Sequence, residues 1–175
     1  MKRILFLGLL LFATSGLAAV EFSKEQIKNI AKAYEYGKTV VADDGMTFEV
    51  MMAGILYAES SGGINTADKL FDSIGAFQIR PLVAKELIEE HLPQYHWLLK
   101  NDGKLLNMLL NDFDFSLELA GVHIKVYYNE ALQRGKHNPW VRTLSRYNGG
   151  WNNKTYINRV LRKIWILRKY GVIEK

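Results

Sequence analysis

The chain has 175 residues, is 49% hydrophobic and 23% charged, carries a formal net charge of +5 and contains no cysteine. A chain of this size favours one domain with a substantial core. Its hydrophobic fraction excludes intrinsic disorder, and its three prolines exclude a proline-rich or collagen-like protein. The absence of cysteine excludes a disulfide scaffold, a thiolate zinc site, a cysteine nucleophile and a lipid-modified cysteine anchor.

The first residues have the pattern of a cleavable secretory signal peptide. Lys2 and Arg3 precede an uncharged apolar run, Ile4 to Phe12, and small residues follow it. The run is shorter than the roughly 20 residues that a membrane-spanning helix needs, so an uncleaved anchor is the weaker alternative. We therefore predict a signal peptide over 1–19 and a single domain over 20–175. Loss of the two basic residues lowers the net charge from +5 to +3, which does not indicate nucleic-acid binding.

The start of the predicted domain indicates two helices. Ser23 and Gln26 have the spacing of a capping box for a helix that reaches about Val41. Thr47 is placed to cap a second helix over 48–60. Most sides of this second helix are apolar, which is typical of a helix in the core rather than on the surface.

The rest of the chain predicts a loop-rich stretch with one short β-like run, followed by more helices. Turn residues and caps set the expected boundaries. The expected segments are the β-like run 76–79, a helix over 81–91 that starts at Pro81, a turn at 101–103, a long apolar helix capped by Asp112 or Asp114 and ended by Gly135, a short segment over 138–146, and an amphipathic helix over 155–170. No internal repeat or linker divides the chain.

Several common catalytic and metal-binding motifs are absent. The sequence has no Gly-x-Ser-x-Gly elbow, no phosphate-binding loop and no glycine-rich dinucleotide fingerprint. Its four histidines include no i,i+4 pair, and its aspartates lack the pattern of a calcium loop. We therefore expect no metal and no cofactor, and hydrolytic chemistry would have to rest on carboxylates.

Glu59 is a carboxylate in an unusual position. It comes at the end of the apolar helix, and helical spacing places it on the same face as Met52, Ile55 and Leu56. Burial and the negative end of the helix dipole both favour the neutral acid, so both should raise the pKa of Glu59. A carboxylic acid with a raised pKa can donate a proton near neutral pH. The alternative is that Glu59 turns into water at a frayed helix end.

Four short motifs surround Glu59 in the sequence. They are AESSGG over 58–63, SIGAFQI over 73–79, SRYNGG over 145–150 and YINRV over 156–160. Together, and in this order, they resemble the soluble lytic transglycosylases of the lysozyme-like superfamily. The resemblance covers roughly 47–164. It implies a mainly α (α+β lysozyme-like) fold, a helical bundle around the central apolar helix with a small β-like hairpin beside an active-site groove.

The resemblance also implies roles for individual residues. Glu59 matches the single catalytic acid and base of the family, and Tyr147 matches the tyrosine that points toward it. The positions that match substrate-binding or groove-lining residues are Ser60, Gly75, Phe77, Gln78, Asn148 and Tyr156, with Tyr156 more often a packing residue. The sequence departs from the family at Gly75-Ala76-Phe77-Gln78, where Gly-Leu-Met-Gln is more familiar, and it lacks a second acid before Tyr156.

The implied reaction is the cleavage of peptidoglycan without water. Glu59 would protonate the oxygen of the β-1,4 bond between N-acetylmuramic acid and N-acetylglucosamine. The acetamido oxygen can stabilise the cation, so a second carboxylate is not needed. The C6 hydroxyl, deprotonated by Glu59, then closes a 1,6-anhydromuramoyl end. Small members of the family often open the wall locally for secretion, conjugation or flagellar machines.

Two other functions remain open. A hydrolytic lysozyme would need a partner acid for Glu59, and Asp68 and Asp72 are the candidates. A non-catalytic module that binds peptidoglycan during assembly would keep the groove and lose the chemistry.

Basic residues on the 155–170 helix also allow contact with an anionic membrane, although a helix packed on the domain with a solvated basic side is the more ordinary interpretation. We expect a periplasmic monomer whose partners are glycan strands, with no nucleic acid and no stable membrane anchor.

Overall fold

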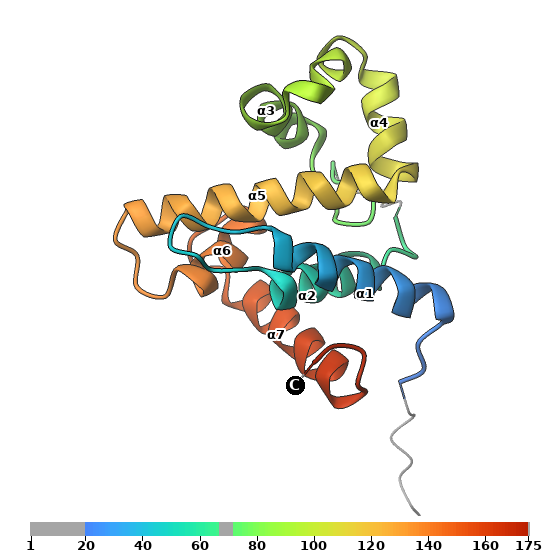
Figure 1. Cartoon of the computed structure of the whole chain (residues 1–175), viewed down its shortest axis with the longest axis vertical. Coiled ribbons are helices and arrows are strands. Elements are labelled where there is room, and N and C mark those ends of the chain that lie inside the picture. The colour runs from blue at the N-terminus through green and yellow to red at the C-terminus, as the bar shows by residue number, and fades with distance from the viewer. Residues whose placement is uncertain (1–19, 67–71, 175) are drawn as a thin grey trace, which may run out of the picture.

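The computed structural model describes residues 20–66 and 72–174, and over these ranges the protein is mainly helical, as predicted (Figure 1). The signal peptide predicted over 1–19 lies outside the described residues. Within them, no helix combines the length and the apolar character that crossing a membrane requires. The helices are α1 (Lys24–Thr39), α2 (Glu49–Ser60), α3 (Pro81–His91), the 3-10 helix η1 (Pro93–Lys100), α4 (Asp102–Asn111), α5 (Phe113–Gln133), α6 (Pro139–Tyr147) and α7 (Lys154–Lys169).

Helix α2 is the central core helix that its composition predicts. Its residues from Met51 to Leu56 are fully buried, and α1 and α7 both pack against it. In Figure 1 the long helix α5 crosses the molecule, with α1, α2 and α7 on one side and α3, η1 and α4 on the other. The apolar residues of α2 therefore contribute to the core on nearly every side of the helix.

A glycine allows α2 and α7 to approach closely. A Cβ atom on Gly54 would lie 2.5 Å from the Cγ1 atom of Ile164 and 3.2 Å from that of Val160. Five residues further along α2, Glu59 accepts a hydrogen bond from Arg159 in the second turn of α7. The packing of α7 on α2 therefore sets the surroundings of Glu59.

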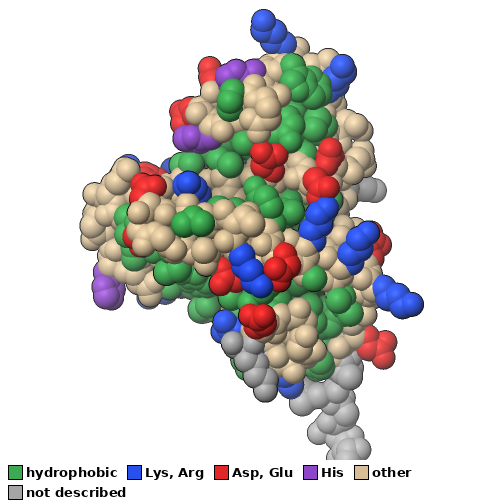
Figure 2. Space-filling view, viewed as in Figure 1, with side chains coloured by type: hydrophobic (Ala, Val, Ile, Leu, Met, Phe, Trp, Pro, Cys, Tyr) green, Lys and Arg blue, Asp and Glu red, His purple; other side chains and the backbone are tan. Residues whose placement is uncertain are grey.

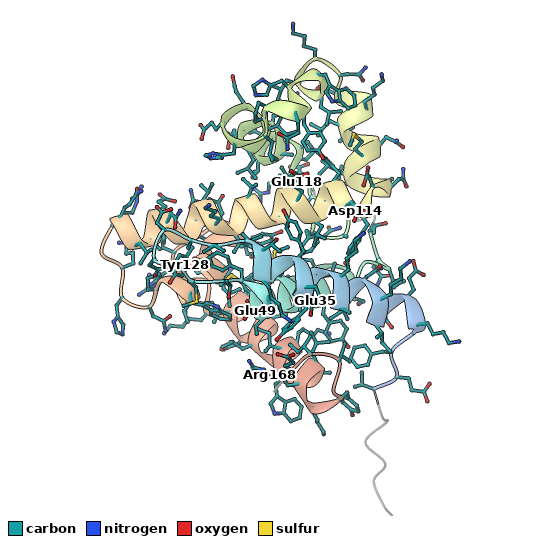
Figure 3. The ribbon with its side chains drawn as sticks, viewed as in Figure 1. Glu35, Glu49, Asp114, Glu118, Tyr128 and Arg168 are labelled. Carbon is teal, nitrogen blue, oxygen red and sulfur yellow. The ribbon has the colours of Figure 1, made fainter. Side chains whose placement is uncertain are left out.

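The helices α3, η1 and α4 form a small lobe over α5. Glu118, which lies on the side of α5 facing this lobe (Figure 3), accepts hydrogen bonds from the Tyr95 hydroxyl and the Gln94 amide, each at 2.8 Å. Three leucines of the lobe itself are buried: Leu98 of η1 and Leu105 and Leu109 of α4. A buried apolar contact and a polar tie to α5 therefore hold the lobe in place.

Local signals predict several helix ends correctly. Ser23 and Gln26 form the expected capping box, and α3 runs from Pro81 to His91 as predicted. Asp112, one of the two expected caps, accepts a hydrogen bond from the backbone N–H of Phe115 at the start of α5.

Other local predictions are wrong. Thr47 does not cap α2, because it forms an isolated β-bridge with Val41, and the capping position falls on Phe48. The turn expected at 101–103 is the start of α4, whose first turn is capped by the Asn101 side chain. The sequence prediction also missed η1.

The predicted β-like hairpin is not confirmed. The segment forms one isolated antiparallel bridge between Ile74 and Ile79. Gly75 and Gln78 both have positive φ angles, 83° and 49°, so the chain reverses at once, and α3 begins only two residues after the bridge. Because α3 begins so soon after Ile79, the segment has no second strand long enough to form a hydrogen-bonded ladder. We call residues 73–79 the 73–79 turn below.

Basic and acidic side chains are intermixed on the face shown in Figure 2. Ion pairs contribute to this pattern, since Lys38 contacts Glu35 at 2.8 Å and Lys32 contacts Asp114. The outer side of α7 differs, because that helix contains six basic residues and no acidic one.

Candidate active site

Glu59 lies on the buried face of α2, as its spacing predicts. Its side chain is 11% exposed, and burial raises the pKa of its carboxyl above the usual range. Glu59 is the next-to-last residue of the helix, so the negative end of the helix dipole also disfavours its ionised form. Both effects favour the protonated form of the carboxyl, which is the form that can donate a proton.

Two residues of α7 oppose this effect. The Arg159 guanidinium donates a hydrogen bond of 3.0 Å to Oε1 of Glu59 and lowers the pKa of the carboxyl. The nearby Tyr156 hydroxyl acts in the same direction, although it is buried and makes no hydrogen bond of ordinary geometry within the described part of the chain. Burial remains the larger effect, so the pKa of Glu59 stays raised.

Tyr147 completes a cluster with Glu59, Tyr156 and Arg159, which we call the Glu59 cluster. The rings of Tyr147 and Tyr156 stack with their centroids 6.5 Å apart, and the Arg159 guanidinium lies 4.9 Å from the centre of the Tyr156 ring. Burial and the charge of Glu59 raise the pKa of both phenols well above their usual range. Both hydroxyls therefore stay protonated and can act as hydrogen-bond donors.

The Tyr147 hydroxyl reaches another predicted site residue, but through the backbone. It donates a 2.8 Å hydrogen bond to the carbonyl oxygen of Phe77. This bond ties the end of α6 to the 73–79 turn. Tyr147 thus connects the Glu59 cluster with the motif that the sequence places nearly 70 residues earlier.

The side chain of Gln78 holds the 73–79 turn together. Its amide nitrogen donates to the carbonyl oxygens of Gly75 at 2.9 Å and Thr66 at 3.2 Å, and its amide oxygen accepts from the Ser73 hydroxyl at 3.2 Å. Both amide donors are therefore occupied inside the protein. Gln78 lines a cavity beside the cluster, but a bond to a sugar would have to replace one of these internal bonds.

Three of the predicted substrate contacts are structural in this conformation. Phe77 is fully buried against Phe113, so its side chain lines no groove. A Cβ atom on Gly75 would lie 1.9 Å from the Leu109 carbonyl oxygen, so this glycine allows close approach to α4 rather than to a sugar. Ser60 is 1% exposed, and its hydroxyl accepts from the N–H of Gly63 and donates to Leu56, which closes the end of α2.

A cavity of about 300 Å³ opens beside Tyr147. Its wall comes from the 73–79 turn, α3, α5 and α6, and it consists of Ser73, Gln78, Arg80, Val83, Glu86, His123, Tyr127, Arg146, Tyr147, Asn148 and Gly149. Asn148 is exposed in this wall, and its amide oxygen accepts a bond from Asn153. Glu59 lies behind Tyr147 rather than in the wall itself.

Sequence reasoning missed three residues of this region. Arg159 appears within the YINRV motif, but only the packing of α2 on α7 shows that it contacts a residue 100 positions earlier. His123 and Arg146 line the cavity, and nothing in the local sequence of His123 distinguishes it from a core residue. Arg146 and Arg159 are charged residues inside recognised motifs, SRYNGG and YINRV, and this is the one signal that could have indicated them.

Of the two candidate partner acids for a lysozyme, Asp72 is exposed and is not part of the Glu59 cluster. Asp68 lies outside the described residues. Over residues 20–66 and 72–174, no group of three or more histidine, aspartate or glutamate side chains is arranged to hold a metal ion. The chemistry that the Glu59 cluster offers is that of one buried carboxyl with hydrogen-bond donors around it.

Comparisons with known proteins leave the family open. No family model matches the chain, and no solved structure matches it significantly. The chain is 26% identical over 193 aligned residues to an uncharacterized 20.7 kDa protein from the vs-regB intergenic region of Enterobacteria phage T4. The alignment covers 99% of this chain and 98% of the phage protein. The similarity thus extends over nearly the whole length of both proteins, and the phage protein's name assigns it no activity.

Proposed function

We propose that the protein is a lytic transglycosylase that cleaves peptidoglycan after export to the periplasm. The observation that carries this proposal is the buried carboxyl of Glu59, whose pKa is raised and which lies in one cluster with two protonated tyrosines and one arginine. The order of the four motifs supports it, and so does the position of the cluster beside a cavity.

The arrangement suits one group that acts first as an acid and then as a base. Arg159 binds Oε1 of Glu59, which leaves Oε2 as the oxygen that can carry and donate the proton. The neutral acid gives that proton to the glycosidic oxygen, and the bond to the muramoyl C1 breaks. The resulting carboxylate is stabilised by Arg159 and by the Tyr156 hydroxyl.

The second half of the reaction restores the acid. The acetamido oxygen of the muramoyl residue stabilises the cation at C1, and the Glu59 carboxylate then takes the proton of the C6 hydroxyl as that oxygen bonds to C1. The product is a 1,6-anhydromuramoyl end, and the proton has returned to Glu59. No water is consumed and no second carboxylate is required, which agrees with a cluster built on one acid.

The test is the digestion of purified peptidoglycan sacculi by the mature chain, by Glu59→Gln and by the control variant Glu35→Gln. Glu35 is exposed and pairs only with Lys38 over the described residues. We expect the parent and Glu35→Gln to clear the sacculi and Glu59→Gln to fail. Clearing by Glu59→Gln at the parental rate would overturn the catalytic role of Glu59. Binding without clearing by the parent would favour a non-catalytic assembly module.

A further inference from the structure

The cavity beside Tyr147 contains polar groups that are not used by the fold. Both ring nitrogens of His123 and Nε of Arg146 are buried and have no hydrogen-bond partner among the described residues. His123 is 4% exposed. Buried polar groups without partners are uncommon and cost free energy. These three atoms have almost no accessible surface, so a ligand in the cavity meets Arg146 through the rest of its side chain, which is 35% exposed.

Arg146 is fixed in place by its aromatic neighbours. Its guanidinium lies 4.9 Å from the centre of the Tyr127 ring and 5.6 Å from that of Trp151. The nearest carboxylate, Glu130, is 3.9 Å from Nε of Arg146, and its other oxygen is held by Arg134 at 2.7 Å. Arg146 is therefore positioned by stacking while its donors remain available, and a guanidinium in this state matches a carboxylate.

The charges in the cavity wall favour one negative charge on the ligand. Arg80 and Arg146 are the two cations of the wall and Glu86 is its one anion. Burial and Arg146 lower the pKa of His123 to about 3, so the imidazole is neutral and offers one donor and one acceptor. A ligand group with one carboxylate would therefore complement the wall through Arg146.

We propose that this cavity binds the acidic peptide substituent of a muramoyl residue through Arg146. The inference rests on the proposed function, because it names the part of the peptidoglycan substrate that this cavity would bind. Tyr147 belongs both to the cavity wall and to the Glu59 cluster. A glycan whose muramoyl residue lies at Glu59 can therefore place its substituent in the cavity. A glycan without the substituent would leave the cavity polar groups unpaired.

The test uses two ligands that differ only in charge, an N-acetylmuramoyl dipeptide with one free carboxylate and the same compound with that carboxylate amidated. Their affinities are measured by calorimetry in a Glu59→Gln background and in the same background carrying Arg146→Gln. We expect Arg146→Gln to weaken binding of the acidic ligand by about 10- to 100-fold, the usual range for a hydrogen bond to a charged group. Amidation should cost a similar factor before the substitution and little after it.

Control variants separate binding from folding. Arg162→Gln removes an exposed arginine of α7 that lies outside the cavity wall, and it should leave both affinities unchanged. Thermal unfolding of each variant shows whether it folds. Arg80→Gln removes the other cation of the cavity wall. Equal affinity for the two ligands in the parent, or an unchanged preference in Arg146→Gln, would overturn the inference. Such a result would leave cleavage by Glu59 intact, whereas a parent that binds the acidic ligand through Arg146 but cleaves nothing would refute only the proposed function.

Discussion

The Glu59 cluster and the 73–79 turn both come from motifs of the same resemblance, yet their polar groups are used differently. In the turn, the Gln78 side-chain amide donates hydrogen bonds to two backbone carbonyl oxygens, and Gly75 packs against α4. In the cluster, a carboxyl and two phenols have raised pKa values, and the Tyr156 hydroxyl lacks a hydrogen bond of ordinary geometry within the described residues. The difference indicates that the turn has a structural role and positions Tyr147. The cluster, in contrast, has polar groups that remain available to react with or bind a substrate.

Replacing the carboxyl of the cluster should have the largest effect. We expect Glu59→Gln to reduce the rate of peptidoglycan cleavage by about 10²–10⁴-fold, the usual contribution of a general acid. Because the pKa of Glu59 is raised in the fold, its ionisation costs stability as the pH rises through that pKa, so the variant should be at least as stable as the parent at neutral pH. Initial rates on sacculi and thermal unfolding measure the two effects. A stable variant with parental rates would place the chemistry elsewhere.

The turn should respond to substitution through stability instead. In Gly75→Ala the new Cβ meets the Leu109 carbonyl oxygen at a positive φ, and we expect a loss of about 2–6 kcal/mol in the free energy of unfolding. Gly149→Ala is the matched control, because Gly149 also has a positive φ but nothing lies within 4 Å of its Cβ position. It should lose only about 1–2 kcal/mol. Urea unfolding compares them, and equal losses would show that the contact with α4 does not matter.

The buried histidine between the two regions should make stability depend on pH. The pKa of His123 falls from 6.5 to about 3 on folding. The unfolded chain therefore binds a proton that the folded chain does not, and stability is lost as the pH falls below 6.5. Between pH 6.5 and pH 5 this amounts to about 1.5 kcal/mol.

His123→Phe should remove that part of the pH dependence, since the aromatic ring can still pack on Tyr127 and Tyr147. His137→Gln, at an exposed position, is the control and should keep it. Urea unfolding at pH 5 and pH 6.5 measures the difference. If the parent and His123→Phe lose the same free energy over this range, the imidazole is not buried in the neutral form.

The smallest expected effect concerns Arg159. Its guanidinium lowers the pKa of Glu59, so Arg159→Gln should move the alkaline limb of the activity profile to higher pH. The direction follows because the proton donor must be protonated to act. Arg162→Gln on the same helix is the control. A shift to lower pH would mean that Glu59 does not set this limb.

The features that were predicted correctly from the sequence are those that short local patterns determine. The capping box at Ser23 and Gln26, the start of α3 at Pro81 and the buried position of Glu59 all follow from spacing along one element. The pairing of Glu59 with Arg159 depends on how closely α2 approaches α7, which no local pattern reports.

The 73–79 turn shows the other limit of sequence reasoning. Gly75 and Gln78 match motif positions, but a motif does not show whether a glycine faces a ligand or a neighbouring helix. Only the contact with Leu109 and the internal bonds of the Gln78 amide answer that question. The same holds for His123, whose burial against Tyr127 and Tyr147 comes from tertiary packing.

The most direct test of the central claim is mass spectrometry of the muropeptides that the mature chain releases from sacculi in ¹⁸O-labelled water. A one-carboxylate transglycosylase predicts 1,6-anhydromuramoyl products, each lighter by one water than the hydrolysis product and free of ¹⁸O. Glu59→Gln should release none of them. Reducing muramoyl ends that carry ¹⁸O, without anhydro products, would contradict the account and favour a hydrolytic lysozyme with a second acid such as Asp68 or Asp72.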